Sequence, residues 1–263
     1  LDIESESRRY ATEFPDKEGP IRVRHLFCHL GGIVHYTNGK VIRTRRDYPV
    51  ENPFESVIYA LDTFRESPLV NAPGEKFAYT THGFILLSAV VERAGNQKFI
   101  DQVRDRIAKP MKMETLQPDY QWKEIPHRAV GYRKRDGEIV VSTDTDVSWK
   151  LGGGGFISSI TDLARYGVGL LAGTLVSAET EKLMWTPQAT ADGTQTTYGL
   201  GFQIFNPENP RVLGHGGAQE KTRTVLVLSP ESQTGVVVMS NCEYANPNRF
   251  AQILLPLLTP AAK

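Results

Sequence analysis

Residues 73–84, PGEKFAYTTHGF, combine a turn, a short extended run and the beginning of an apolar helix. The proline–glycine pair ends the element before it. The extended run then brings Tyr79 to the start of an apolar stretch, residues 83–94, which a Gly-Asn pair closes. A tyrosine at such a turn, with threonine hydroxyls after it, could carry a proton, or it could be a half-buried aromatic whose hydroxyl caps the turn. Because an unperturbed tyrosine has a pKa of about 10, it needs a neighbouring group to act at neutral pH, and both interpretations stay open.

A second stretch, residues 213–224, has the sequence LGHGGAQEKTRT and places His215 before two glycines and an expected strand. Glycine lets a backbone pass close to a ligand, and a strand edge beside a glycine-rich turn can point an N–H group at a developing oxyanion. His215 could then orient a substrate carboxylate or assist proton movement. The alternative is a tight turn that contains an incidental histidine.

A glycine run and a pair of histidines are weaker signals. Residues 150–159, KLGGGGFISS, lack the Gly-Lys-Ser/Thr ending of a phosphate-binding loop, so close backbone packing or a flexible wall is the preferred interpretation. His25 and His29 are spaced like two metal ligands on a helix, but the HExxH pattern and an obvious third ligand are missing. His35 and His127 stand in no motif and are predicted to be ordinary polar residues. No metal and no cofactor is predicted.

The composition is that of a globular protein, with 40% hydrophobic and 23% charged residues in a chain of 263. Its 30 basic and 30 acidic residues cancel, which argues against a nucleic-acid partner, since such proteins carry a basic excess. No apolar run reaches the roughly 20 residues of a membrane-spanning helix, so no transmembrane segment is predicted. Cys28 and Cys242 lie far apart in the sequence and do not form a disulfide framework. Their pairing and the protein's compartment stay open.

The spacing of apolar residues predicts that helices come first and a sheet last. Helices are expected over residues 21–30, 53–65, 83–94, 99–108, 161–171, 177–185 and 246–258. A hairpin is expected around the pair Asp136-Gly137, and strands are expected over residues 198–205, 222–228 and 235–240. The closing helix is expected to lie on one face of that sheet.

Taken together, these stretches resemble the serine β-lactamase and penicillin-binding-protein-like hydrolases. Within them the chain is similar to the branch that includes the mitochondrial β-lactamase-like protein and its bacterial relatives. The similarity runs from Leu1 to about Pro260, and the matching blocks occur in the family's order. They read here IRVRHLFCHLGGI from residue 21, PGEKFAYTTHGFILLSAVVERAGNQKF from residue 73, GGGGFISSITDLARYGVGLLAG from residue 152 and GHGGAQEKTRTVLVLSPESQTGVVVMSN from residue 214.

The resemblance implies an α/β fold of the α+β type, specifically the β-lactamase/transpeptidase-like fold. It implies a single domain over residues 1–263, with a mostly helical lobe over about 20–190. The rest, about 195–263, would be a lobe of antiparallel sheet flanked by helices, among them the C-terminal helix, with a cleft between the lobes.

The resemblance also implies acyl transfer through a serine ester. Tyr79 matches the family's proton-shuttling tyrosine, and Thr81 stands where the family often has asparagine. His215, Gly216 and Gly217 match the motif that lines the sheet side of the cleft, and the backbone N–H of Ala218 would be an oxyanion donor. The substrate would be a small molecule or a peptide with an ester, amide or peptide bond, which leaves esterase, peptidase and β-lactamase activities open. For localisation, the family allows a bacterial periplasmic or secreted protein without deciding it.

One departure from the family's pattern concerns the nucleophile. No serine in this sequence has a lysine three residues later, whereas the family's Ser-x-x-Lys motif precedes the segment that resembles Leu1. The family's N-terminal strands and central nucleophile helix are therefore expected to be missing, and the sheet is expected to keep a bare edge open to self-association or to a complementing chain. Two hypotheses remain: a serine hydrolase whose nucleophile lies outside this chain, or a catalytically silent binding or assembly protein. A zinc hydrolase, the third, would require bound metal.

Overall fold

The structure is a computed structural model that describes residues 1–208 and 211–258. The chain forms two compact units, each built from segments that are discontinuous in sequence. The helical unit comprises Leu1–Asp105, Val147–Phe156 and Pro187–Gly201. The sheet unit comprises Arg106–Asp146, Ile157–Thr186 and the chain from Phe202 onward.

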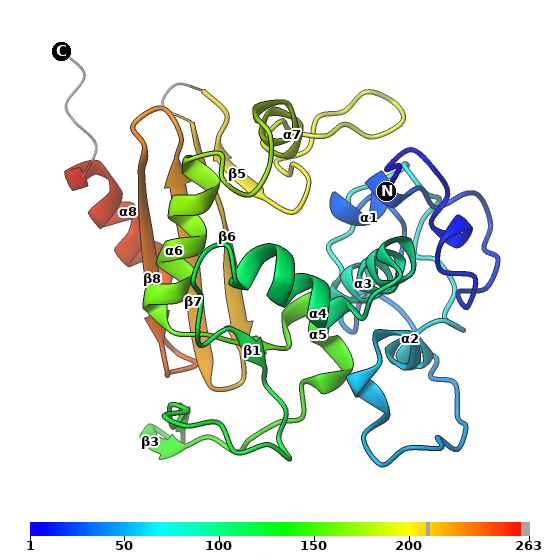
Figure 1. Cartoon of the computed structure of the whole chain (residues 1–263), viewed down its shortest axis with the longest axis horizontal. Coiled ribbons are helices and arrows are strands. Elements are labelled where there is room, and N and C mark those ends of the chain that lie inside the picture. The colour runs from blue at the N-terminus through cyan, green and yellow to red at the C-terminus, as the bar shows by residue number, and fades with distance from the viewer. Residues whose placement is uncertain (209–210, 259–263) are drawn as a thin grey trace. The chain divides into compact units, whose positions relative to one another are not determined.

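Helix α3, Thr81–Gly95, is the centre of the helical unit (Figure 1). The Thr80 side chain caps its first turn by accepting a hydrogen bond from the Gly83 amide, and Asn96 ends it in the left-handed conformation, with φ of 47°. The expected helix is therefore confirmed, with two further residues at its start. Its apolar residues are buried and pack in one core with residues from several other elements, among them Phe14, Leu26, Leu61 and Leu151. A helix with such broad apolar coverage is typical of a core position.

The remaining elements of the helical unit are short. They are η1 (Ser7–Arg9), α1 (Val23–Phe27), η2 (Pro53–Glu55), α2 (Val57–Ala60), η3 (Leu61–Thr63), α4 (Phe99–Val103), η5 (Ser148–Lys150) and α5 (Leu151–Gly154). The expected helix over residues 53–65 is wrong as a continuous element, because Ser56 is extended, with φ of −95° and ψ of 118°. Helix α4 is shorter than expected, and a π-helical segment, η4 (Arg104–Ala108), follows it.

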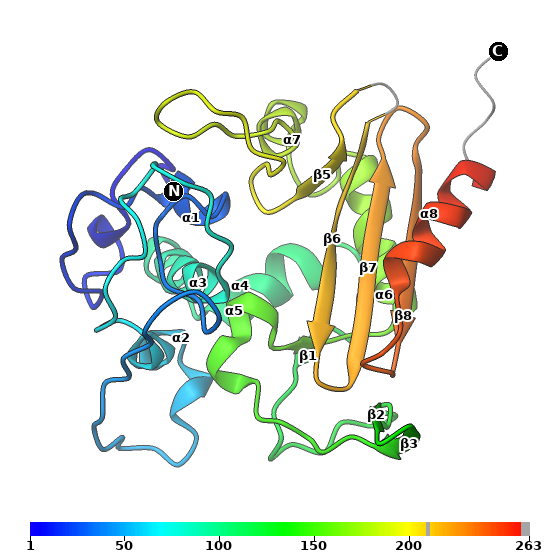
Figure 2. The same cartoon turned by 180° about the vertical axis from the view of Figure 1, so that it is seen from behind.

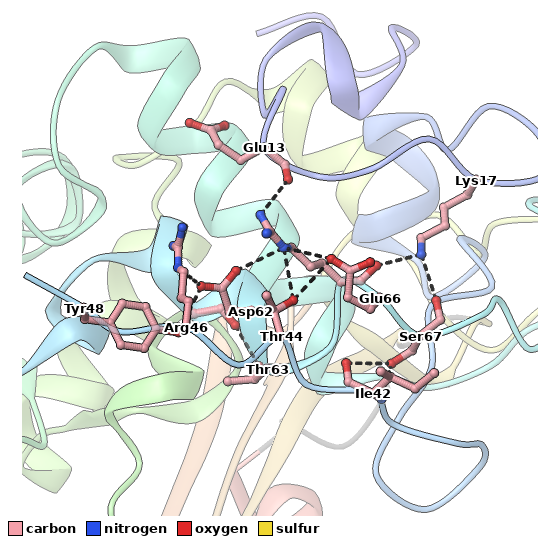
Figure 3. Close-up of polar contacts among 12 residues, drawn as sticks. Glu13, Lys17, Ile42, Thr44, Arg46, Tyr48, Asp62, Thr63, Glu66 and Ser67 are labelled. Atoms are coloured by element: carbon pink, nitrogen blue, oxygen red, sulfur yellow. Dashed lines mark hydrogen bonds and ion pairs between the residues drawn. The ribbon is translucent and has the colours of Figure 1, made fainter.

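A buried carboxylate anchors the long loop that precedes α2. Asp62 is 1% exposed, and its Oδ2 lies 2.7 Å from Arg46 Nε and accepts a hydrogen bond of 2.9 Å from the Tyr48 hydroxyl (Figure 3). Its Oδ1 lies 3.0 Å from Arg65 Nε. The Thr44 amide donates to the Asp62 carbonyl as well. Residues 42–48 have no helix or strand, so these contacts give the loop a defined path over the helical unit.

A four-stranded antiparallel sheet is the centre of the sheet unit. Its order is β5-β6-β7-β8, formed by Gln203–Asn206, Val212–Gln219, Thr222–Ser229 and Thr234–Ser240. The register pairs Leu213 with Leu228 and Ala218 with Arg223 across β6 and β7. Strands β7 and β8 confirm the expected ones, whereas the first expected strand, residues 198–205, forms only from Gln203 onward.

A helix covers each face of this sheet. Helix α6 (Ile160–Leu171) packs on β7 and β8 from one face, and α8 (Pro247–Leu258) packs on them from the other (Figures 1 and 2). Alternate side chains of β7 enter two separate cores. Leu226 and Leu228 pack with Leu170 of α6, and Val225 and Val227 pack with Ala251 and Leu255 of α8. The prediction that the closing helix lies on the sheet is confirmed.

The rest of the sheet unit is local structure. Helix α7 (Ala178–Met184) begins after Ser177, whose hydroxyl accepts a hydrogen bond from the Thr180 amide. Strands β2 (Tyr132–Arg135) and β3 (Glu138–Val141) form the expected hairpin, with positive φ at Asp136 and Gly137 as its tight turn requires. Two short strands, β1 (Gln117–Pro118) and β4 (Phe156–Ile157), complete the elements.

The two units do not follow the predicted lobe boundaries at about residues 190 and 195. Residues 106–146 and 157–186 belong to the sheet unit although they were assigned to the helical lobe. Helix α6 explains part of this difference, because its apolar side packs on the sheet. That both units form one β-lactamase-like domain stays a prediction.

Candidate active site

The predicted site residues fall into two groups, one in each unit. Tyr79 and Thr81 lie at the start of α3 in the helical unit, and His215, Gly216, Gly217 and Ala218 lie on β6 in the sheet unit. Each group is built by its own local structure.

Aromatic rings surround Tyr79. The His29 ring lies 4.4 Å from the Tyr79 ring, and the His35 ring lies 5.7 Å from it at a near-perpendicular angle. The His29 ring also contacts Tyr198 and Phe84 at 4.7 and 5.2 Å. Tyr79 is nevertheless 44% exposed. A half-exposed tyrosine held between two imidazoles has a fixed direction and remains accessible to a reactant.

The phenol of Tyr79 keeps its proton at neutral pH in this environment. Partial burial, with a smaller contribution from Tyr36, raises its pKa above the usual value. Such a phenol is a proton donor, and it becomes a base only when a positive charge comes close.

Three histidines, His29, His35 and His82, hold this part of the chain through hydrogen bonds to backbone groups. His35, predicted to be an ordinary polar residue, is 7% exposed and its Nδ1 accepts a hydrogen bond of 3.2 Å from the Thr81 amide. His29 accepts in the same way from the Thr80 amide, also at 3.2 Å. His82 donates from Nδ1 to the Val34 carbonyl at 2.8 Å. Partners 46 to 51 residues away cannot be found from spacing, so no signal in a single sequence reveals this arrangement.

His25 and His29, considered as a pair of metal ligands, have different partners in the structure. His25 Nδ1 accepts from the Arg22 amide at 3.3 Å within the first turn of α1. His29 lies beyond the end of that helix, with φ of 58°, and turns toward Tyr79. The two imidazoles therefore do not share a helix face.

The glycine run packs against α3. A Cβ on Gly152 would lie 2.7 Å from the Phe84 carbonyl oxygen, and a Cβ on Gly153 would lie 2.9 Å from that of Thr81. This close backbone approach is the interpretation that the sequence favoured over a phosphate-binding loop. The four-residue helix α5 therefore borders the same turn that carries Tyr79.

On β6, residues 215–218 form part of a regular strand rather than the glycine-rich turn that the sequence suggested. They pair in register with β7, and the turn comes later, at Glu220 and Lys221. Glycine allows the close pairing: a Cβ on Gly217 would lie 2.6 Å from the Thr224 hydroxyl. Pairing with β5 ends at Gly214, so β5 leaves the outer edge of residues 215–219 uncovered.

His215 has a defined tautomer. Its Nδ1 lies 2.6 Å from the Gly216 carbonyl, and because a carbonyl can only accept, Nδ1 carries the proton. Burial lowers the pKa of the ring, although the hydrogen bond to Gly216 opposes the shift. Neutral His215 therefore presents Nε2 as its basic nitrogen.

The turn between β6 and β7 is tied to a distant loop. Lys221 is paired with Asp144, and the Thr145 hydroxyl bonds to Glu220. The pair Glu220-Lys221 thus fixes the end of β6 to residues 144–145.

Comparison with known proteins assigns the chain to a family. A model of the family described as Beta-lactamase matches residues 1–259. The chain belongs to the β-lactamase family. Penicillin-binding proteins from Bacillus subtilis and a D-aminopeptidase from Brucella anthropi are among the curated proteins to which the chain is similar.

Individual relatives give the extent of the similarity. The human mitochondrial serine beta-lactamase-like protein LACTB is 26% identical over 90% of this chain and 60% of its own length. Its mouse counterpart is 33% identical over 69% of this chain and 38% of its own length. The chain thus spans 38–60% of the length of these curated relatives.

Solved structures show the same fold at low identity. A D-stereospecific amidohydrolase from Streptomyces sp. has a TM-score of 0.77 at 20% identity, over 96% of this chain and 78% of that protein. An octameric penicillin-binding protein homologue from Pyrococcus abyssi has a TM-score of 0.74 at 24% identity, over 98% of this chain and 60% of that protein. The predicted β-lactamase/transpeptidase-like fold is confirmed. In the described residues, no helix has the length and apolar character needed to span a membrane.

Proposed function

We propose that this chain is the larger part of a serine hydrolase that cleaves an ester, amide or peptide bond through an acyl-enzyme. The observation that carries the proposal is Tyr79, an accessible phenol that two histidine rings hold at the start of the buried helix α3.

Each predicted residue has a role in the proposal. A serine hydroxyl attacks the substrate carbonyl, and its proton passes through Tyr79 to the leaving group, while Thr81 contacts the substrate. The negative charge that develops on the carbonyl oxygen is stabilised by the backbone N–H of Ala218, on the part of β6 that β5 does not cover. His215 orients the substrate through Nε2, and Gly216 and Gly217 let the substrate approach the strand. Water then releases the acyl group.

The nucleophile is proposed to lie in a segment outside residues 1–263. No serine of the chain is followed by lysine at the third position, and that lysine would also supply the positive charge that Tyr79 requires. Strand β8 is an edge of the sheet, which gives such a segment a place to add a strand.

The proposal is tested with Tyr79→Phe in the full-length protein. Turnover of ester and D-amino-acid amide substrates should fall at least ~100-fold, the scale of a general acid–base contribution, while the circular dichroism spectrum stays unchanged. Tyr244→Phe, at an exposed tyrosine of the sheet unit, is the control and should retain full activity. Undiminished turnover in Tyr79→Phe would refute the proton-relay role.

A second candidate is a catalytically silent assembly protein. It is favoured by α8, on which Phe250, Ile253 and Leu257 are 56, 56 and 77% exposed beside the edge strand β8. Exposed apolar side chains spaced i, i+3 and i+7 lie on one face of a helix, and such a face is typical of an interaction site. Light scattering on the full-length protein separates the candidates: a stable oligomer with no turnover and no acyl-enzyme supports assembly, whereas turnover supports the hydrolase.

A further inference from the structure

Two segments of the helical unit, residues 29–35 and 78–82, lie side by side next to Tyr79. The Ala78 amide donates to the His29 carbonyl at 2.9 Å, and the Thr80 hydroxyl donates to the Val34 carbonyl at 2.8 Å. Residues 29–35 and 78–82 are thus joined on both sides of Tyr79, although they are about 46 residues apart in the sequence.

The amides of Thr80 and Thr81 use imidazole nitrogens as their acceptors. The first amides of a helix have no intrahelical partner, and water or a capping side chain usually satisfies them. Here the Thr80 hydroxyl already accepts a hydrogen bond from the Gly83 amide. The amides of Thr80 and Thr81 instead donate to the imidazoles of His29 and His35. Thr80 and Thr81 are buried, at 2 and 6% exposure, which excludes bulk water as a substitute acceptor.

From these contacts we infer that His35 is a positioning residue, whose Nδ1 fixes the Thr81 amide and so holds Tyr79 and Thr81 in the orientation that the reaction uses. His29 does the same one residue earlier, at the Thr80 amide. The inference rests on the proposed function for its catalytic consequence. Its structural part, that an imidazole lone pair orders the start of α3, stands independently.

The geometry requires one protonation state of His35. An N–H donor approaches Nδ1, so Nδ1 carries no proton and the ring is the neutral Nε2–H tautomer. The groups that face the ring are Tyr36 at 3.7 Å, Tyr79 at 5.7 Å and His82 at 6.3 Å between ring centres, and the charge of Lys150. Burial and the Lys150 charge lower the pKa of His35, which keeps it neutral at physiological pH. Protonation in acid would place two N–H groups against each other and release the Thr81 amide.

Asparagine and leucine at position 35 provide a matched pair of variants, because their side chains have nearly the same shape. Only asparagine carries an acceptor, its Oδ1, where the imidazole has Nδ1. His35→Leu should lower kcat/KM on the order of 10- to 100-fold, the scale of a small misplacement of a catalytic group. His35→Asn should stay within about threefold of the wild type. It should also lose the part of the acid limb of the pH–rate profile that His35 protonation causes.

A second measurement is independent of catalysis. Amide hydrogen exchange by NMR should show the Thr81 amide protected in the wild type and in His35→Asn, but exchanging at least ~10-fold faster in His35→Leu. Histidine ¹⁵N shifts should show an unprotonated Nδ1 on His35 at pH 7.

The outcomes separate this inference from the proposed function. Equal losses of activity in His35→Leu and His35→Asn, or an unchanged Thr81 exchange rate in His35→Leu, overturn the positioning role. If Tyr79→Phe keeps full turnover while Thr81 exchange responds as expected, the proton-relay role of Tyr79 fails and the ordering of α3 by His35 stands.

Discussion

Replacing Asp62 by asparagine removes the charge that anchors the loop over residues 42–48. The carboxylate is 1% exposed and meets Arg46 at 2.7 Å, Arg65 at 3.0 Å and the Tyr48 hydroxyl at 2.9 Å. Breaking a buried ion pair from one side costs about 3–5 kcal/mol. The side chains of Arg46 and Arg65 are 39 and 23% exposed and can regain water, so we expect the lower end, about 3 kcal/mol of unfolding free energy.

The assay is urea unfolding followed by the fluorescence of Trp149, which packs against the core of the helical unit. Replacing the other two tryptophans, Trp122 and Trp185, by phenylalanine leaves Trp149 as the reporter of this unit. Asp47→Asn, at an exposed neighbouring carboxylate, is the control and should change the unfolding free energy by less than about 0.5 kcal/mol. Tyr48→Phe removes one hydrogen bond and should fall between them, at about 1 kcal/mol. A loss below about 1 kcal/mol in Asp62→Asn would refute the anchoring role, because it would equal one ordinary hydrogen bond.

Three further predictions use the pKa values and the packing. Burial lowers the pKa of His82 to about 4, so an unfolded chain binds its proton first as the pH falls. Unfolding free energy should therefore decrease from pH 6.5 down to about 4, by up to ~1.4 kcal/mol per pH unit, and His82→Asn should lose this dependence in urea titrations. Gly152→Ala should lower the unfolding free energy by about 1–3 kcal/mol in the urea titration, since the added Cβ would lie 2.6 Å from the Ser88 Cβ. Gly31→Ala is the control: its Cβ would make only ordinary contacts at 3.4 Å, and the substitution should cost less than about 1 kcal/mol. Burial raises the pKa of Cys28 to about 11, so at pH 8 iodoacetamide should label Cys242 on the order of 100-fold faster, as peptide mass spectrometry would show; equal rates would contradict the buried, protonated thiol.

Local signals were enough to predict the elements that carry their own end markers. Helix α3 has a threonine cap and a Gly-Asn end, α6 has a serine cap, and the β2–β3 hairpin has the Asp-Gly pair that its turn requires. In each case the information lies within a few residues of the element, so one sequence contains it.

The features that were missed depend on partners far away in the chain. Strand β6 lacks apolar alternation after Leu213, and only its pairing with β7 makes residues 215–218 a strand. The helix expected over residues 53–65 is interrupted at Ser56, beside a segment that Asp62 ties to the loop of Arg46. Tertiary contacts of this kind override local propensity.

Dependence on distant partners also explains which parts of the candidate site could be predicted. Tyr79, Thr81 and the residues of β6 from His215 to Ala218 were predicted through a family resemblance, and their catalytic roles remain predictions. The supporting histidines were not predicted, because the acceptor of the Thr81 amide lies 46 residues earlier in the chain.

The central claim is that the chain belongs to a serine hydrolase whose nucleophile lies outside residues 1–263. Intact-mass spectrometry of the full-length protein, before and after reaction with a fluorophosphonate probe, tests it most directly. The account predicts one adduct, mapped by peptide sequencing to a serine upstream of Leu1 that has a lysine three residues later. An adduct on a serine within these 263 residues would contradict the assignment of the nucleophile, and a full-length protein with no adduct would contradict the hydrolase.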